Sequence, residues 1–370
     1  MTTNTVLANL FDFDKGNKFY RVSNTSGKTW IIPTNNMTTA IQLYQPSGRN
    51  GILLKTMFPY LHPFLFVRNI FHAEEIRCEM KEEISQFVCN TFQKENIEYS
   101  IFCGTPSVHQ KITVQISNHH KILGYCKFTD NPDIAQLFFH EERQLNRLRL
   151  SGITNIPHPL FCGQQSNNIW VFIQDTTKTT HSKTFHSWTP AHESFINDLY
   201  HNTKQHILFE ETDFYKQLLL LMKQLSWLPD KLTKQIVTTT YKQLTNKWSG
   251  RDVSFSTYHA DFTPWNVFFE KNNLFVFDWE YSGQTYPPFL DKYHFLTQTA
   301  IFKHHWGTKE IIQHIVNNPK LQIDTDSYKA YLLDIISRYT IREQGKIFGD
   351  VAHSMKQWTT LLDYLNTAKP

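Results

Sequence analysis

One segment, residues 258–280, constrains the fold of this chain more than any other. It places His259, Asp261 and Asn266 in the spacing H-x-D-x-x-x-x-N, and Asp278 follows after two short apolar runs. A carboxylate on a sharply turning loop projects into a cleft, and an amide five residues later returns to the same cleft. The segment is therefore expected to gather two carboxylates and one amide at one place.

The two apolar runs predict a hairpin. Residues 267–270 and 274–277 flank the pair Asn272 and Asn273, which tolerates positive φ and therefore favours a tight turn. The far end of such a hairpin returns the chain, and with it Asp278, to the start of the first strand.

This set of side chains is typical of phosphoryl transfer from ATP. That reaction uses one carboxylate to accept the proton of the attacking hydroxyl, and an amide with a second carboxylate to hold magnesium. Mg²⁺ prefers oxygen ligands and keeps several waters, so one carboxylate, one amide and the ATP phosphates suffice. The alternative is a chance H-x-D beside a buried hairpin, because short motifs often match without the function.

The string H-x-D-F-T-P-W-N, followed by D-W-E at 278–280, resembles the aminoglycoside phosphotransferase and choline kinase group, the small-molecule branch of the protein-kinase-like fold. Protein kinases instead follow the magnesium aspartate with Phe-Gly and a long activation loop. One departure is Ala260, where the branch commonly has glycine. The resemblance covers roughly residues 99–300.

The resemblance implies a role for each residue of the motif. Asp261 is expected to be the catalytic base, and His259 to brace the loop by hydrogen bonding. Asn266 and Asp278 are expected to bind Mg²⁺, while Glu280 faces the acceptor or a second cation.

The nucleotide half of such a site is expected upstream. Residues 99–103, 111–116 and 121–129 alternate apolar and polar positions and predict three strands, and Lys127 occupies the position of the nucleotide lysine. On the following predicted helix, 134–150, Glu141 occupies the position of the lysine's partner, with Glu142 as the alternate. The competing interpretation is that these are solvated surface charges.

The remaining nucleotide contacts rest on the resemblance alone. Gly104 stands nearly alone where protein kinases have three glycines, so Ser107 or nearby backbone amides are expected to cover the phosphates. A strand over 168–175 leads to a hinge where the backbone near Gln174 and Asp175 reads the adenine edge.

The expected fold class is α+β, a protein-kinase-like two-lobe fold with a small mixed β-sheet N-lobe and a mainly helical C-lobe. Helical periodicity supports the second lobe, at residues 208–228, 231–248, 328–339 and 351–365. We expect three parts: an N-terminal extension over residues 1–97, an N-lobe with the hinge over 98–176, and a C-lobe with the catalytic loop over 177–370.

The extension is expected to have few strands and to pack on the N-lobe, with a helix over 73–97. Residues 51–71 are apolar, but charged residues and prolines interrupt them, so they predict contact with a membrane surface or partner and no transmembrane segment. Five cysteines without C-x-x-C spacing predict reduced thiols and a cytoplasmic location. The net charge of +4 gives no indication of nucleic-acid binding.

The sequence thus predicts an ATP- and Mg-dependent phosphotransferase acting on a hydroxyl of a small molecule. The segment 178–206 carries five histidines but only two acids, Glu193 and Asp198, which does not suit a polycation. A sugar, an amino alcohol or a glycan intermediate is therefore preferred to an aminoglycoside. Two alternatives remain open: a catalytically silent nucleotide-binding scaffold, and a metal-binding module built on the histidines.

Overall fold

The computed structural model describes residues 3–25, 27–46, 48–104, 110–165 and 168–367. The chain forms two compact units, each of which is discontinuous in sequence. Unit 1 comprises Met1–Leu150, Thr154–Thr184 and Phe268–Glu280, and unit 2 comprises Ser151–Ile153, Phe185–Val267 and Tyr281–Pro370. The hairpin that follows the H-x-D loop thus belongs to unit 1, whereas the loop itself belongs to unit 2.

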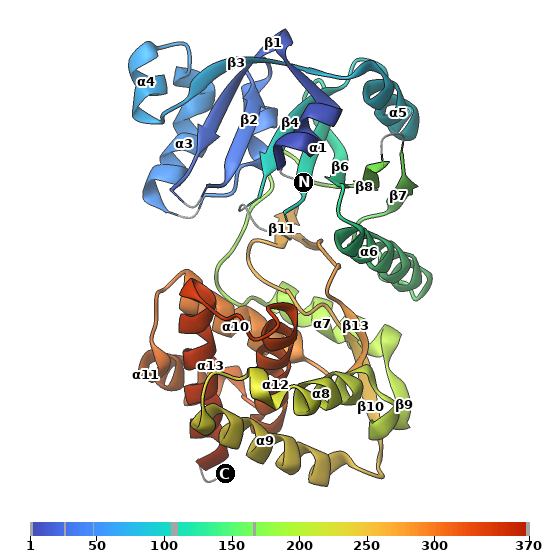
Figure 1. Ribbon diagram of the computed structural model, residues 1–370, viewed down its shortest axis with the longest axis vertical. Coiled ribbons are helices and arrows are strands. Elements are labelled where there is room, and N and C mark those ends of the chain that lie inside the picture. Colours follow the sequence, from blue (N-terminus) through green and yellow to red (C-terminus); the bar gives the residue numbers. More distant parts are fainter. Residues whose placement is uncertain (1–2, 26, 47, 105–109, 166–167, 368–370) are drawn as a thin grey trace. The chain divides into compact units, whose positions relative to one another are not determined.

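Unit 1 is built on an eight-stranded sheet with the order β3-β1-β2-β4-β5-β6-β8-β7, in which neighbouring strands are antiparallel (Figure 1). Its strands are β1 (Phe11–Ser23), β2 (Thr29–Pro33), β3 (Glu74–Met80), β4 (Glu98–Cys103), β5 (Ile112–Asn118), β6 (Lys121–Thr129), β7 (Pro159–Gln164) and β8 (Trp170–Asp175). Its helices are α1 (Thr3–Leu10), α2 (Met37–Ala40), η1 (Ile41–Leu43), α3 (Arg49–Leu61), α4 (Leu65–Ile70), α5 (Glu82–Phe92) and α6 (Pro132–Leu150).

Residues 1–97 contribute three strands to this sheet, and the expectation of weak strand content there is wrong. The helix predicted over 73–97 is also wrong in its first part, because β3 occupies residues 74–80 and only α5 is helical. In β3, Cys78 and Met80 are buried while Arg77 and Glu79 are exposed, which is the two-residue period of a strand. Ile76, Met80 and Ile84 also fit a spacing of four residues, which is why the sequence favoured a helix.

The extension is tied to the rest of unit 1 by its core and by hydrogen bonds. Nine of its residues lie in the same buried cluster as the central strands, namely Val6, Leu10, Phe11, Phe19, Ile31, Cys78, Met80, Ile84 and Val88. The Ser100 hydroxyl donates to the Ala40 carbonyl at 3.0 Å, and the Gln115 side-chain amide donates to the Thr39 carbonyl at 3.0 Å. The helix α2 therefore lies against strands β4 and β5.

Strand β6 requires glycine at position 124. Gly124 is paired with Asp175 of β8, and a Cβ at this position would lie 2.0 Å from the Gln174 carbonyl oxygen. The two strands therefore approach each other more closely here than a side chain permits.

The predicted hairpin is present, with strands β11 (Val267–Glu270) and β12 (Asn273–Val276). Its turn lies one residue earlier than expected: Lys271 and Asn272 are the two residues with positive φ, at 47° and 72°. Positive φ at both central positions is the conformation that favours tight hairpins.

Unit 2 is mainly helical. Its elements are α7 (Pro190–Thr203), β9 (Gln205–Leu208), η3 (Phe209–Glu211), α8 (Asp213–Lys223), η4 (Leu225–Trp227), α9 (Lys231–Trp248), β10 (Asp252–Tyr258), β13 (Gly283–Tyr286), α10 (Leu290–Phe302), α11 (Thr308–Ile311), η5 (Ile312–Val316), η6 (Pro319–Leu321), α12 (Thr325–Arg342) and α13 (Gly349–Thr367). The predicted helix 231–248 is confirmed, and α12 and α13 contain the two predicted C-terminal helices. The expected α+β class is therefore confirmed.

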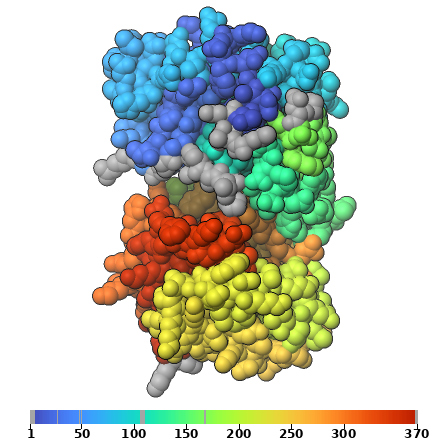
Figure 2. All heavy atoms as spheres, in the orientation of Figure 1, coloured from blue at the N-terminus to red at the C-terminus, as the bar shows by residue number. Residues whose placement is uncertain are grey.

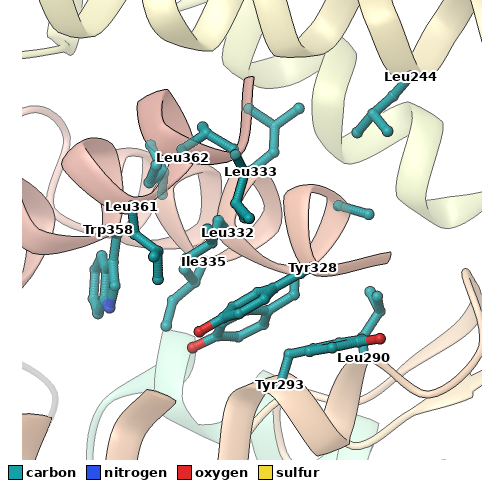
Figure 3. Packing of buried hydrophobic residues seen from close by; sticks show 14 of the residues in the cluster. Leu244, Leu290, Tyr293, Tyr328, Leu332, Leu333, Ile335, Trp358, Leu361 and Leu362 are labelled. Atoms are coloured by element: carbon teal, nitrogen blue, oxygen red, sulfur yellow. The ribbon is translucent and has the colours of Figure 1, made fainter. Parts of the chain in front are cut away.

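The core of unit 2 packs around α12. Ten consecutive residues of this helix, 328–337, are buried, so it is covered on all sides. Tyr328 stacks on Tyr293 of α10 with ring centroids 4.9 Å apart, and Trp358 and Leu362 approach from α13 (Figure 3). This packing fixes α10, which carries two side chains of the candidate site.

No helix among the described residues is long and apolar enough to cross a lipid bilayer. All five cysteines are free thiols, and burial raises the pKa of Cys78 to about 12.

We predict that deleting residues 1–97 prevents folding of the remainder. The deletion would leave the edge of β4 unpaired and remove about half of the buried cluster of unit 1, and such exposed apolar edges aggregate. Solubility and circular dichroism of residues 98–370 would test this. Co-expression with residues 1–97 as a separate chain is the matched control, and we expect it to restore soluble protein. A folded, monomeric remainder without that partner would contradict the prediction.

Candidate functional site

In unit 1, five charged side chains form one group, which we call the Lys127 cluster: Lys111, Lys127, Glu141, Asp278 and Glu280. The Lys127 ammonium lies 2.6 Å from a carboxylate oxygen of Glu141 and 2.7 Å from one of Asp278. Lys111 is ion-paired with Glu280, and its Nζ lies 3.6 Å from Asp278. The structure thus brings together Lys127, Glu141, Asp278 and Glu280, all of which the sequence singled out.

Local structure explains how Glu141 reaches Lys127. In α6, Ile134, Phe138, Leu145 and Leu148 are buried together with Glu141, at the spacing of one helical face. Glu141 therefore points into the protein and has no exposed surface. Its second carboxylate oxygen accepts the Trp279 backbone N–H at 3.3 Å, which links α6 to the segment after β12.

Asp278 lies at a sharp change of chain direction. Its φ is 69°, in the left-handed region that non-glycine residues adopt at a cost of about 1–2 kcal/mol. The next residue, Trp279, is fully buried, and its indole N–H donates to the Val276 carbonyl at 3.1 Å. The anchored indole therefore holds the turn that directs the Asp278 carboxylate toward Lys127.

Burial and charge act in opposite directions in this cluster. Burial lowers the pKa of Lys127, but the carboxylates of Asp278 and Glu141 outweigh it and the pKa lies above its usual value. Burial raises the pKa of Glu141 to about 7, against the attraction of Lys127. Three carboxylates face two ammonium groups, so the ionised cluster has an excess of negative charge.

The cluster fits a divalent cation. Among the described residues, Glu141, Asp278 and Glu280 are the one group of three or more potential ligands, with one oxygen of each within 4.8 Å of the others. Carboxylate oxygens are the ligands that Mg²⁺ prefers, and the negative excess favours a cation.

Lys111 was missed by the sequence analysis as a site residue, although a signal was present. Thr113 is the cross-strand partner of Lys127, and Lys111 precedes Thr113 by two residues. Side chains two residues apart point to the same face of a sheet, so Lys111 was placed beside Lys127 by the strand register.

The proposed nucleotide contacts are placed as follows. Gln174 is the cross-strand partner of Tyr125, two residues before Lys127, so its buried side chain is on the same sheet face as Lys127. Asp175 accepts the His158 backbone N–H at 2.6 Å. Gly104 follows β4, and its carbonyl accepts from the Gln110 side chain at 2.7 Å. Ser107 lies outside the described residues.

In unit 2, residues 259–266 form the loop after β10, which we call the Asp261 loop. The Asn266 side-chain amide donates to Asp261 Oδ2 at 2.7 Å and to the Asp261 carbonyl at 3.0 Å. Because its nitrogen is used in this way, the Asn266 amide oxygen is the atom that remains suited to a cation. The Asp261 side chain is 32% exposed, so solvent and ligands reach its carboxylate.

His259 has a hydrogen bond within the loop. Its Nδ1 accepts the Asp261 backbone N–H at 3.1 Å, and the imidazole is fully buried. Such a contact fixes the backbone at Asp261 and leaves the imidazole away from solvent.

The Asp291 carboxylate holds the backbone at the start of the Asp261 loop. Asp291 lies in the first turn of α10, which starts at Leu290. Its carboxylate accepts the backbone N–H groups of His259 at 2.9 Å and Ala260 at 3.2 Å. Ala260 has φ of 69°, in the left-handed region that favours glycine.

His294 is a second residue that the sequence analysis missed. Its Nε2 lies 3.2 Å from Asp261 Oδ1, and burial holds the pKa of His294 well below its usual value. The neutral ring must donate through Nε2, since an ionised carboxylate only accepts. Asp291 and His294 are one helical turn apart on α10, and this spacing was the available signal.

The histidine-rich segment 178–206 does not assemble into a metal site among the described residues, where the acidic group of the Lys127 cluster is the sole candidate. His192 instead forms a capping box with Thr189 at the start of α7. Burial lowers its pKa to about 4, so the ring is neutral at physiological pH.

Comparison with known proteins supports the fold. No protein-family model matches this chain, and no curated sequence matches it. A thermostable mutant of aminoglycoside phosphotransferase APH(4)-Ia in the apo form matches with a TM-score of 0.50 and 12% identity, over 76% of this chain and 98% of that chain. Its ternary complex with ADP and hygromycin B gives a TM-score of 0.51 and 11% identity, over 78% of this chain and 100% of that chain.

This chain therefore has the fold of aminoglycoside phosphotransferases, and the predicted protein-kinase-like fold of the small-molecule branch is confirmed. At identities of 11% and 12% the similarity concerns the fold. The roles of individual side chains follow only from their chemistry.

We predict a pH-dependent stability difference between the wild type and Asp291→Asn. Burial raises the pKa of Asp291 to about 7 from 3.8, so between these values the folded protein retains a proton that the unfolded chain has lost. The wild type should therefore lose stability relative to the variant as pH rises from about 4 to about 7, by at most about 1.4 kcal/mol per pH unit. Above pH 7 the difference should be constant.

Urea unfolding at several pH values measures this difference. Asp363→Asn, an exposed carboxylate of α13, is the matched control and should show no such trend. Parallel pH profiles for the wild type and Asp291→Asn would contradict the prediction.

Proposed function

We propose that this protein is an ATP- and Mg²⁺-dependent phosphotransferase that transfers the γ-phosphate to a hydroxyl of a small molecule. The observation that carries the proposal is the buried Lys127, held between Glu141 and Asp278. Burying an ammonium with two carboxylates costs desolvation free energy, and an apolar cluster of the same size would stabilise the fold at least equally. A phosphate-binding role accounts for its presence, and the shared fold agrees with it.

Lys127 would contact the phosphates of ATP. Glu141 would hold the ammonium in place, because its carboxylate is itself fixed by burial and by the Trp279 N–H. Lys111, which is ion-paired with Glu280, would keep the Glu280 carboxylate oriented. The backbone near Gln174 and Asp175 would receive the adenine ring.

Asp278 and Asn266 would hold magnesium, through a carboxylate oxygen and an amide oxygen. The bound ion would neutralise charge on the β- and γ-phosphates during transfer.

Asp261 would act as the general base. Its carboxylate is oriented by two donors, the Asn266 amide and the neutral His294 ring, and remains partly exposed. The acceptor hydroxyl would give its proton to Asp261 as its oxygen bonds to the γ-phosphorus. The bond from that phosphorus to the bridging oxygen would break, and ADP would leave with the bonding electrons.

The acceptor is proposed to be a sugar, an amino alcohol or a glycan intermediate. A polycationic aminoglycoside would need several carboxylates in its pocket. Of the two acids in segment 178–206, Glu193 accepts the Trp188 indole N–H at 2.8 Å and lies 3.6 Å from the Lys292 ammonium. This carboxylate is therefore already used within the protein.

A catalytically silent nucleotide-binding scaffold is the second candidate. It shares the Lys127 cluster but would not need an oriented carboxylate at position 261. The hydrogen bonds from Asn266 and His294 favour the enzyme, because they position a group that binding alone does not require.

We predict that Asp261→Asn reduces turnover by about 100- to 10,000-fold, the contribution typical of a general base. Binding of ATP should change little, since the assigned role of Asp261 concerns the acceptor. ATP consumption against a panel of sugars, amino alcohols and aminoglycosides would measure turnover, and calorimetry would measure nucleotide binding. Asp363→Asn is the control for a lost surface carboxylate. Wild-type turnover in Asp261→Asn would remove the base assignment.

A separate prediction concerns magnesium. Asp278→Asn should abolish the magnesium-dependent part of the thermal stabilisation by ATP, because a carboxylate ligand of the ion is lost. The control is Asp133→Asn, an exposed acid at the start of α6 in the same unit. Equal magnesium dependence in Asp278→Asn and the wild type would reject the metal role. A nucleotide shift that persists while no acceptor is consumed would favour the silent scaffold.

A further inference from the structure

Two lysines of unit 1, Lys55 and Lys178, lie beside each other without an acidic partner. Lys55 belongs to α3 and Lys178 follows β8, so the fold brings them together from distant parts of the sequence. Both side chains are partly buried, and no carboxylate among the described residues acts on either ammonium. Shielded charges in proteins normally have partners of the opposite sign. Two neighbouring ammonium groups without such a partner favour binding of an anion.

The position of the Lys178 ammonium is fixed by the N-terminal extension. Its Nζ donates to the Gln42 carbonyl of η1 at 2.9 Å. An ammonium has three N–H donors, so this contact leaves two for a ligand. The next residue, Thr179, donates its hydroxyl to the Glu270 carboxylate at 2.8 Å, and Ser182 donates to the same oxygen at 2.7 Å. Glu270 is therefore engaged by hydroxyl groups and does not neutralise Lys178.

The Tyr44 hydroxyl adds a third donor to this part of unit 1. A Cβ at position 51 would lie 2.8 Å from this hydroxyl, so only Gly51 lets Tyr44 approach α3 so closely. Lys55 follows Gly51 by one helical turn on the same face, and side chains of a helix lean toward its N-terminus. The Lys55 side chain therefore extends toward the Tyr44 hydroxyl. The Tyr44 ring is held by an edge contact with Trp30, with ring centroids 4.8 Å apart.

The lysine pair responds to its surroundings as two unpaired charges do. Burial lowers the pKa of Lys178 to about 7, with a further contribution from the Lys55 ammonium. Burial also lowers the pKa of Lys55, to about 8. A bound anion would favour the charged form of both groups. Blue atoms of the α3 region form part of the visible surface in Figure 2, so solutes reach this region from solvent.

We propose that Lys55, Lys178 and Tyr44 bind a phosphate group, either as free phosphate or as the monoester of a small molecule. A phosphate carries a charge close to −2 and three strong acceptor oxygens, which match two ammonium groups and one hydroxyl. None of these residues belongs to the Lys127 cluster, so this site is separate from the proposed nucleotide site. A bound phosphate would bridge α3 of the N-terminal extension and the segment that follows β8.

The test is calorimetric titration of the full chain with inorganic phosphate and, in parallel, with ribose 5-phosphate. We expect the wild type to bind both, because both present the same charged group. Tighter binding of ribose 5-phosphate would assign the site to a phosphorylated small molecule, and equal or weaker binding would assign it to the free ion. Failure of the wild type to bind either compound would overturn the proposal.

Two variants locate the binding. Lys55→Met and Lys178→Met should each weaken phosphate binding about 10- to 100-fold, the loss of one charge-assisted hydrogen bond. Lys121→Met, which removes an exposed lysine of β6 in the same unit, is the matched control and should bind as the wild type does. Wild-type affinity in both test variants, or an equal loss in the control, would contradict the assignment. Without phosphate, both test variants should melt no lower than the wild type, because an unpaired ammonium is replaced by an apolar side chain of similar length.

The pH dependence of sulfate binding provides an independent readout, because the charge of sulfate is constant in this range. Both ammonium groups lose their protons as pH rises from about 6 to about 9, so the affinity for sulfate should fall over this interval. Lys178→Arg keeps its charge at every pH in the interval and should lose less affinity than the wild type. A sulfate affinity of the wild type that does not change with pH would overturn the proposal.

Discussion

The ion pairs of Lys127 are the interaction on which the organisation of unit 1 depends. A buried ammonium is tolerated only with partners close by, so strand β6, helix α6 and the segment after β12 must meet at one point. Each arrives through a local constraint: the alternation of β6, the apolar face that includes Glu141, and the left-handed turn at Asp278. The charged group thus fixes how the hairpin from late in the sequence joins the sheet.

Unit 2 also contains buried polar groups that need partners, and here they belong to the backbone of the Asp261 loop. The turn at Ala260 directs two N–H groups inward, and the Asp291 carboxylate accepts both. Tyr258, the residue before His259, is held by Arg338, whose guanidinium lies 5.8 Å from the ring centre and is paired with buried Asp334 at 2.8 Å. Helices α10 and α12 therefore set the position of the loop, and the mainly helical core serves to hold Asp261.

Much of this arrangement was predictable because it is local in sequence. The hairpin and the strands around Lys127 follow from periodicity and spacing, whereas Glu141 was singled out by its match to the resembled family. The strand β3 was mistaken for a helix because Ile76, Met80 and Ile84 fit both periods, and only pairing with β1 decides between them. Lys111, Asp291 and His294 act through contacts with residues far away in sequence. The spacing of Asp291 and His294 on α10 indicates that they share a face, but it does not identify these partners.

The same ion pairs bear on how the proposed site would bind ATP. In the structure Lys127 and Asp278 neutralise each other at 2.7 Å. In the proposed complex Lys127 would face phosphate and Asp278 would face magnesium, so each ion would exchange one partner for another of the same sign. Such an exchange leaves no buried charge unpaired at any stage, provided that nucleotide and metal bind together. Nucleotide alone would place phosphate beside three carboxylates, and this repulsion would be the physical reason for the proposed magnesium dependence.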